Sequence, residues 1–187
     1  MGRRAAGQVR IIGGRWRNTR LPVADAEGLR PTSDRARETL FNWLAPMLPG
    51  ARVLDPFAGS GALGLEAISR GARAAVLVER DRRQCDTLRA IAQRLPGGDA
   101  VRVVHDDALA FLAKPTQERF DLVFVDPPFD ADLWEPALAQ LDPLVSEDAW
   151  LYLETPLHRN IQPGEGWRLH REGSTRDARH ALYRRQG

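Results

Sequence analysis

The chain has 187 residues, of which 43% are hydrophobic and 28% charged, and its formal net charge is +2. This length and composition predict one globular domain over residues 1–187, and they exclude a fibrous repeat or a disordered chain. No apolar run approaches the ~20 residues that cross a bilayer, and the basic N-terminus lacks the apolar stretch of a signal peptide. We therefore expect a cytoplasmic protein with no membrane partner.

The cysteine and histidine content argues against a metal site. Cys85 is the only cysteine, which excludes an internal disulfide and a Cys-rich metal site. The four histidines are scattered and show no ligand spacing. We expect no metal.

Charge is distributed unevenly along the chain. Residues 1–37 carry nine Arg against three acidic residues, and residues 168–187 carry six Arg against two. The stretch between them has a net charge of −8. Basic ends attract a polyanion, and the planar Arg fork suits phosphates and base edges. The charge alone leaves open two interpretations, nucleic-acid binding and a merely solvated surface.

The N-terminal part predicts a basic ribbon followed by a helix. Residues 11–20 interleave a glycine pair, Trp16 and three Arg with weak strand signals, so we expect a flexible ribbon over about residues 1–30. Side chains at 32–34 can cap a helix that runs to about Leu48. Its expected buried face has helical spacing and consists of Ala36, Leu40, Trp43, Leu44 and Met47.

From residue 53 to residue 154, short apolar runs alternate with segments of helical period. This pattern is typical of a parallel sheet covered on both faces, and it predicts an α/β domain. The expected strands are 52–55, 74–79, 101–105, 122–126 and 150–154, with a helix after each of the first four. Two further strands, around 167–170 and 180–183, are expected to form a hairpin at one edge of the sheet.

Residues 53–64 read VLDPFAGSGALG, which predicts a strand, a glycine-rich turn and the start of a helix. The glycines let a ligand approach the backbone where a Cβ would block it. Glu79 ends the next expected strand, where its carboxylate can accept bonds from both ribose hydroxyls of an adenosine. Gly59, Gly61 and Gly64 also satisfy the fingerprint of dinucleotide-binding proteins, so this motif alone is equally compatible with NAD as the cofactor. The alternative is that the turn binds no ligand and only caps the helix.

Residues 120–129 read FDLVFVDPPF and carry the more specific signal. The carboxylate of Asp126 and the carbonyl of Pro127 can accept the two N–H bonds of an exocyclic amine on a purine, and proline adds no competing donor. Phe129, which follows Pro128, can stack on a base turned out of its helix. The turns after the first and fourth strands meet where strand order reverses, which is where open sheets bind ligands. The alternative is a strand terminator with a capping Asp.

Together the segments DPFAGSG at 55–61 and DPPF at 126–129 resemble the first and fourth motifs of amino-methyltransferases that use S-adenosylmethionine. Four longer blocks are similar to the RsmD family, the bacterial 16S ribosomal RNA guanine-N2 methyltransferases. These blocks are RIIGGRWR at 10–17, LRPTSDRARETLFNWL at 29–44, FAGSGALGLEA at 57–67 and VFVDPPF at 123–129. The resemblance covers residues 10–185, although residues 17–20 and 173–180 depart from the family pattern.

The resemblance implies a Rossmann-like class I methyltransferase, with a seven-stranded, mostly parallel sheet whose last strand is antiparallel. It implies methyl transfer from S-adenosylmethionine to N2 of one guanine in 16S rRNA, in the small ribosomal subunit or an assembly intermediate. The transfer is expected to be direct, without a covalent enzyme intermediate. We expect a monomer.

The resemblance also implies roles for individual residues. The catalytic set is Asp126, Pro127, Pro128 and Phe129. The cofactor set is Asp55, Phe57, Gly59, Gly61, Glu79, Asp106, Asp107 and Ala108. Within it, Asp55 meets the ammonium, Gly59 and Gly61 pass under the methionine part, Glu79 holds the ribose, and Asp107 or Asp106 accepts from the adenine amine. The RNA-binding set is Arg10, Arg15, Trp16, Arg17, Arg20, Arg30 and Arg35.

Three other functions are weighed against this one. A DNA adenine-N6 methyltransferase shares the Asp-Pro-Pro-aromatic motif, but the chain is short for an added target-recognition domain. A nicotinamide-dependent oxidoreductase explains the glycine turn and leaves Asp126 to Phe129 without a role. A non-catalytic RNA-binding protein leaves both motifs unused. Titration with NADH against S-adenosylhomocysteine separates the two cofactor classes.

Overall fold

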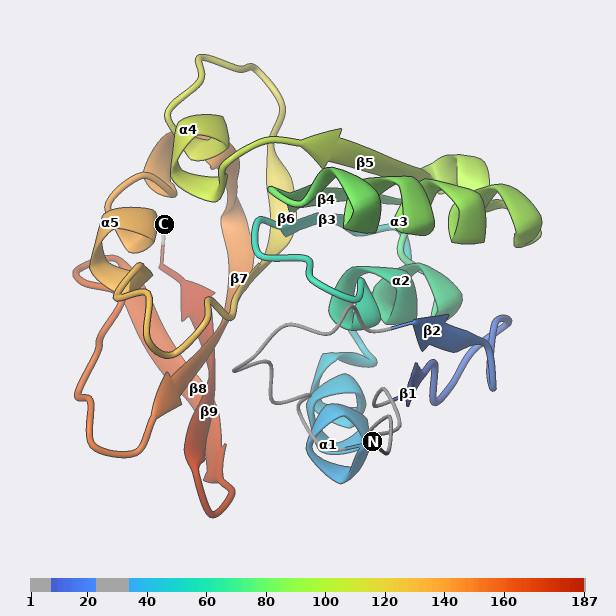
Figure 1. Cartoon of the computed structure of the whole chain (residues 1–187). Coiled ribbons are helices and arrows are strands. Elements are labelled where there is room, and N and C mark those ends of the chain that lie inside the picture. The colour runs from blue at the N-terminus through green and yellow to red at the C-terminus, as the bar shows by residue number, and fades with distance from the viewer. Residues whose placement is uncertain (1–7, 23–33, 187) are drawn as a thin grey trace, which may run out of the picture.

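The computed structural model describes residues 8–22 and 34–186. Its centre is a seven-stranded sheet in the order β5-β4-β3-β6-β7-β9-β8 (Figure 1). The strands are β3 (Arg52–Asp55), β4 (Ala74–Glu79), β5 (Val101–His105), β6 (Phe120–Val125), β7 (Val145–Pro156), β8 (Trp167–Ser174) and β9 (Ala178–Arg185). The five strands expected between residues 52 and 154 and the hairpin at the sheet edge are all present.

Strand directions confirm the expected fold class. β3 pairs in parallel with β4 and with β6, and the ladder continues in parallel to β5 on one side and β7 on the other. The last strand, β9, pairs antiparallel with both β7 and β8. Strand order reverses between β3 and β6, so the turns that follow these two strands emerge side by side at one edge of the sheet.

Helices cover both faces of the sheet. The α-helices are α1 (Asp34–Leu44), α2 (Ala62–Ser69), α3 (Arg82–Arg94), α4 (Ala108–Leu112) and α5 (Trp134–Leu138), with 3-10 turns η1 (Gly98–Ala100) and η2 (Asp142–Leu144). Alternate strand residues such as Val53, Phe124 and Tyr152 share one buried cluster with α1, α2 and α3. The residues between them, such as Val125 and Leu153, share a second cluster with α4 and α5. Figure 1 shows α2 and α3 on one side of the sheet and α4 and α5 on the other.

The fourth strand is shifted from its expected bounds. It begins two residues earlier, at Phe120, because Phe120 is buried and the neighbouring Asp121 side chain accepts a hydrogen bond from the Arg52 amide at 2.8 Å. It ends at Val125, which is the last residue of β6 that pairs with β7. Asp126 therefore stands just beyond the ladder, at the carboxyl edge of the sheet.

Helix α1 is shorter than expected, and its buried face is different. It ends at Leu44, shortly before Pro46, in keeping with the bias of residues that precede proline against helical geometry. The buried side chains are Arg37, Leu40, Phe41 and Leu44, whereas Ala36, Trp43 and Met47 are only partly buried. Leu40 and Leu44 are thus buried as expected, and Trp43 and Met47 pack on the core. The centre of the buried face is shifted, because Arg37 and Phe41 also occupy core positions. Of the three expected capping residues, 32 and 33 lie outside the described residues.

The N-terminal segment corrects the expectation of a flexible ribbon. Strands β1 (Gln8–Arg10) and β2 (Arg20–Pro22) pair as a two-stranded antiparallel sheet. Val9, Ile11, Trp16 and Leu21 are buried in the same cluster as α1 and α2. The hairpin, defined as residues 8–22, is thus packed on the core by its apolar side chains.

None of the described helices is long and apolar enough to cross a membrane.

Candidate active site

The turn between β3 and α2 has glycines where the backbone requires them. Gly61 has φ +78° just before α2, and a Cβ there would lie 2.5 Å from a methyl group of Leu88. Gly59 has φ +52°, and a Cβ there would meet no atom within 4 Å. The backbone therefore packs closely against the protein at Gly61, whereas at Gly59 it has free space in which a ligand can approach it.

Glu79 fixes this turn to the end of β4. Its Oε2 accepts from the Gly59 amide at 2.9 Å, and its Oε1 accepts from the Asp81 amide at 2.8 Å. Asp81 in turn caps α3 through the amides of Arg83 and Gln84. A partly buried carboxylate at the mouth of the turn remains available for a ribose, because each of its oxygens accepts more than one hydrogen bond.

Asp55, the last residue of β3, is a buried acceptor with a lone pair to spare. Its side chain is 1% exposed, and its Oδ2 accepts from the Gly64 amide at 3.2 Å. Its Oδ1 is buried and has no hydrogen-bond partner within the described ranges. Burial raises the pKa of Asp55 to about 7, and the Glu79 carboxylate adds to this effect. An orphaned carboxylate oxygen beside an open glycine turn fits the ammonium of S-adenosylmethionine.

The turn after β5 brings two more acids to the same edge. Asp107 caps α4 by accepting from the Ala110 amide at 3.0 Å. Asp106 is hydrogen-bonded to the Lys114 ammonium, which lowers the pKa of its carboxyl. Ala108 is buried at the start of α4, and Phe57, beside the glycine turn, packs on the cluster beneath α4. All eight residues expected to hold the cofactor thus lie at or just after the carboxyl ends of β3, β4 and β5.

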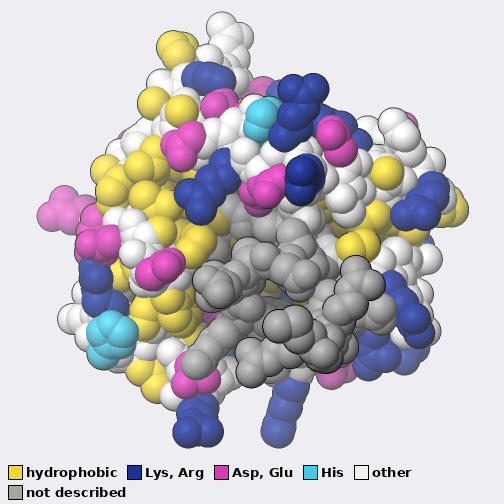
Figure 2. Space-filling model, in the orientation of Figure 1, with side chains coloured by type: hydrophobic (Ala, Val, Ile, Leu, Met, Phe, Trp, Pro, Cys, Tyr) yellow, Lys and Arg dark blue, Asp and Glu magenta, His cyan; other side chains and the backbone are white. Residues whose placement is uncertain are grey.

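The segment after β6 combines a partly buried acid with an exposed ring. Pro127 is buried, whereas Phe129 is 38% exposed and lies 5.9 Å from the Trp134 ring, centroid to centroid. Burial first, and then the carboxylates of Glu154 and Asp55, hold the pKa of Asp126 well above its usual range. Figure 2 shows hydrophobic side chains gathered over the α5 side of the molecule. A stacking ring and an acceptor therefore stand together at the sheet edge.

A buried polar network next to Asp126 was missed from the sequence. The Tyr152 hydroxyl donates to Oε2 of Glu154 at 2.8 Å and lies 2.9 Å from Nδ1 of His180. Glu154 pairs with His180 across β7 and β9, while Leu153 pairs with Val125, so Glu154 is the neighbour of Asp126 on the next strand. The sequence carries a signal for Glu154, because this residue closes the apolar run 149–153, as Glu79 closes the run 74–78.

Polar residues of four adjacent strands thus form one row. Asp55 ends β3 and Asp126 follows β6, whereas Glu154 and His180 pair with each other within β7 and β9. The alternation of buried residues places all four on the face covered by α1, α2 and α3. The carboxylates of Glu154 and Asp55 disfavour the ionised form of Asp126, and a bound cation relieves that repulsion. The row suits a positively charged ligand at this edge.

The expected RNA-binding residues divide into three groups. Arg15, Arg17, Arg20 and Arg35 are exposed, and Arg10 is exposed with its Nε 3.1 Å from Asp34. Arg30 lies outside the described residues. Trp16 is a correction: it is 2% exposed, and its Nε1 donates to the Pro96 carbonyl at 3.0 Å. Its ring belongs to the core and is not available to stack on a base.

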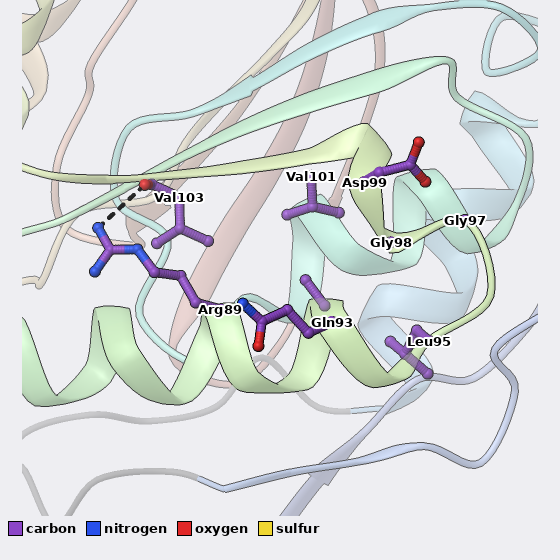
Figure 3. Close-up of a pocket in the computed structure, with 9 residues that line it drawn as sticks. Arg89, Gln93, Leu95, Gly97, Gly98, Asp99, Val101 and Val103 are labelled. Atoms are coloured by element: carbon purple, nitrogen blue, oxygen red, sulfur yellow. Dashed lines mark hydrogen bonds between the residues drawn. The ribbon is translucent and has the colours of Figure 1, made fainter.

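A separate pocket lies away from this edge. It has a volume of about 380 Å³ between α3 and β5, and its lining includes Leu95, Asp99 and Val101 (Figure 3). Arg89 crosses one end and donates to the Val103 carbonyl at 3.3 Å. None of the expected cofactor residues lines it.

Within the described ranges, no three side chains of metal-ligating type gather into a site.

The family model described as "Conserved hypothetical protein 95" matches residues 9–184. The ribosomal RNA small subunit methyltransferase D of Escherichia coli strain K12 is 46% identical over 184 residues, which cover 97% of this chain and 92% of that protein. The chain belongs to the RsmD family. The family resemblance read from the four sequence blocks is thereby confirmed.

Two further similarities extend over nearly the whole of this RsmD-family chain. The protein of the same name from Haemophilus influenzae is 42% identical over 187 residues, covering 96% of this chain and 95% of that protein. The solved structure of the yhhF protein from Escherichia coli superposes with a TM-score of 0.83 at 45% identity, covering 97% of this chain and 99% of that one. Both the glycine turn and the segment after β6 lie inside the matched region.

Proposed function

We propose that this RsmD-family methyltransferase transfers a methyl group from S-adenosylmethionine to N2 of a guanine in 16S rRNA. The observation that carries the proposal is the position of Asp126. It follows β6 beside the end of β3, next to the buried Asp55 and the glycine turn. The names of the relatives support rRNA of the small subunit as the substrate.

The donor site is assigned to residues of β3, β4 and β5. Asp55 holds the ammonium through its unpartnered Oδ1, the Gly59 backbone lies along the methionine part, and Glu79 accepts from the ribose. The acceptor for the adenine amine is assigned to Asp107 or to Asp106, which follow β5. The cofactor, when bound, supplies a methyl group made electrophilic by its sulfonium.

The acceptor site is assigned to residues 126–129. The Asp126 carboxylate and the Pro127 carbonyl accept the two N2–H bonds, and the Phe129 ring stacks on the everted base. The new N–C bond forms as the S–C bond breaks, and the proton released from N2 passes to Asp126 or to water. Nucleophile and methyl must be held ~3–3.5 Å apart, so orientation by these groups supplies most of the catalysis.

Ligand affinity should depend on pH through Asp55. Its pKa is about 7, and only the ionised carboxylate attracts the ammonium. As pH falls from 8 to 6, the Kd for S-adenosylhomocysteine measured by calorimetry should rise, approaching tenfold per pH unit below pH 7. In Asp55→Asn the Kd should be raised at every pH and nearly flat. A wild-type Kd that stays constant over this range would count against the assignment.

The exposed arginines of the hairpin should contribute to RNA affinity. Changing both Arg15 and Arg17 to Ala should weaken RNA binding and reduce the slope of log K against log salt by ~0.7–0.9 for each phosphate that is no longer neutralised. The matched control changes Arg73 and Arg119 to Ala, because these are exposed arginines outside the hairpin, just before β4 and β6. Equal slopes in the two double variants would remove the hairpin from the RNA interface.

We also infer that the protein acts as a monomer in the cytoplasm, on rRNA within the small subunit or an assembly intermediate. Asp55, Glu79 and Asp126 all come from one chain, so the site needs no second copy. An rRNA substrate is found where ribosomes assemble.

The proposed function is tested by incubating the protein with labelled S-adenosylmethionine and small subunits from a strain that lacks the modification. Label should appear at N2 of one guanine of 16S rRNA. Free rRNA and assembly intermediates serve as parallel substrates, and adenine-containing duplex DNA serves as the control. Label on DNA adenine, or binding of NADH in place of S-adenosylhomocysteine, would contradict the proposal.

A further inference from the structure

A second groove, of about 570 Å³, lies on the face of the sheet that α1 covers. Its lining comes from the end of α1 and from β7, β9 and β8, and includes Trp43, Met47, Trp150, His170, Arg171 and Arg184. Trp150 precedes Glu154 by four residues on β7, which places it ~13 Å from Glu154, the neighbour of Asp126. The groove is thus separate from the residues assigned to methyl transfer. We name it the Trp43–Trp150 groove.

Aromatic rings and cations alternate in this groove. The His170 ring meets the Trp150 ring edge to face, with centroids 4.9 Å apart. The Arg184 guanidinium lies 5.6 Å from the Trp150 centroid. Trp43 and Trp150 are only partly buried, although both pack beside the core. The groove therefore offers aromatic surface and positive charge within one space.

A bulge in β8 brings two polar side chains to this groove. Leu169 pairs with Tyr183 and Arg171 pairs with Leu182, so β8 has one residue more than β9 between these pairs. As a result, the consecutive residues His170 and Arg171 both line the groove, which a regular strand would not allow. Bulges of this kind re-aim side chains and are frequent near functional sites.

The charge of the groove indicates its occupant. Its lining contains two arginines and no carboxylate, whereas the pocket in Figure 3 includes Asp99. Arg168 pairs with Arg184 across the two strands and extends the basic surface. Arg184 contacts Asp148 at 3.3 Å, but both side chains are largely exposed, so this ion pair is weak. Tryptophan faces with guanidinium groups match a base with its phosphate, because bases stack on aromatic rings and phosphates pair with Arg.

We propose that the Trp43–Trp150 groove binds one unpaired nucleotide of the RNA, away from the nucleotide that is methylated. This inference rests on the proposed function, since it takes RNA as the substrate. It gives a role to the excess of arginine in residues 168–187, which the transfer site does not use. The base lies against the tryptophan rings, and Arg171 and Arg184 hold the adjoining phosphate.

The test is direct binding of a short single-stranded RNA, measured without cofactor by anisotropy and by quenching of tryptophan fluorescence. Trp43→Leu should raise the Kd by about 5- to 150-fold and reduce the quenching, as expected for the loss of one stacked base. Arg171→Ala should weaken binding and flatten its salt dependence. Fully paired duplex RNA should produce no quenching. In methyl transfer, KM for RNA should rise in both variants while kcat is retained.

The control is Trp167→Leu. Trp167 is also partly buried, but it packs on the opposite face of the sheet with the cluster beneath α4 and α5. Equal RNA affinities for Trp43→Leu, Arg171→Ala and Trp167→Leu would overturn the proposal. Should Trp43→Leu fail to fold in a melting experiment, the exposed Arg171 decides the question. A wild type that binds RNA with quenching but methylates no guanine would refute the proposed function and leave the groove assignment standing.

Discussion

Asp126→Ala should lower kcat for methyl transfer by at least about 100-fold and leave the Kd for S-adenosylhomocysteine within about threefold. The carboxylate is expected to accept from the target amine, whereas the ammonium, ribose and adenine contacts come from β3, β4 and β5. Single-turnover transfer and calorimetry measure the two effects separately. Asp126→Asn should retain more activity than Asp126→Ala, because the amide oxygen still accepts one hydrogen bond.

The matched control is Asp130→Ala, since Asp130 is an exposed acid in the same segment. It should leave both measurements near wild type. Loss of cofactor affinity together with turnover in Asp126→Ala would mean that Asp126 is misassigned. The pH dependence adds an independent readout. Because the pKa of Asp126 is raised, its acceptor form is lost as pH falls, so wild-type kcat should decline on acidification from a higher pH than an ordinary aspartate would give.

Glu66→Ala should destabilise the protein by about 3–5 kcal/mol, because it removes a buried carboxylate that pairs with Arg37 and leaves two hairpin amides without their acceptor. The Arg37 guanidinium keeps its ion pair with Asp34, at 2.8 Å. Glu66 is fully buried on α2, and its Oε2 lies 3.4 Å from the Arg37 guanidinium, itself 1% exposed. The same carboxylate accepts from the amides of Ile12 at 2.9 Å and Gly13 at 2.8 Å, and from Arg70 at 2.9 Å. It therefore joins the hairpin, α1 and α2 at one point.

Urea unfolding gives the free-energy change, and hydrogen exchange locates it. In Glu66→Ala the amides of Ile12 and Gly13 should lose protection first. Asp86→Ala is the control, because the exposed Asp86–Arg89 ion pair on α3 should cost less than about 1 kcal/mol. Equal losses of stability in the two variants would show that the buried carboxylate does not hold the hairpin. Retained protection at Ile12 would lead to the same conclusion.

The sheet was predictable because its central strands are apolar runs in the sequence that are followed by an acidic residue. Asp55, Glu79 and Asp126 each mark a strand end, and strand order alone brings these ends to one edge. The hairpin was not predictable in the same way. β1 and β2 have three residues each, and their burial depends on contacts with α2 more than fifty residues away.

The polar members of the core were the main failure of the sequence interpretation. Arg37 and Glu66 each sit on a helix at a buried position, and helical periodicity counts only apolar residues. Trp16, placed among arginines, was interpreted as an RNA contact although it fills the core. Glu154 and His180 come together only through pairing of β7 with β9, which local sequence does not reveal.

The central claim is that the ends of β3 and β6 hold a methyl donor and a target amine side by side. A crystal structure with S-adenosylhomocysteine tests it most directly. The expected result is the ligand's ammonium at Oδ1 of Asp55, its ribose at Glu79 and its sulfur facing Asp126. Density for the ligand anywhere else, including the pocket between α3 and β5, would contradict the claim.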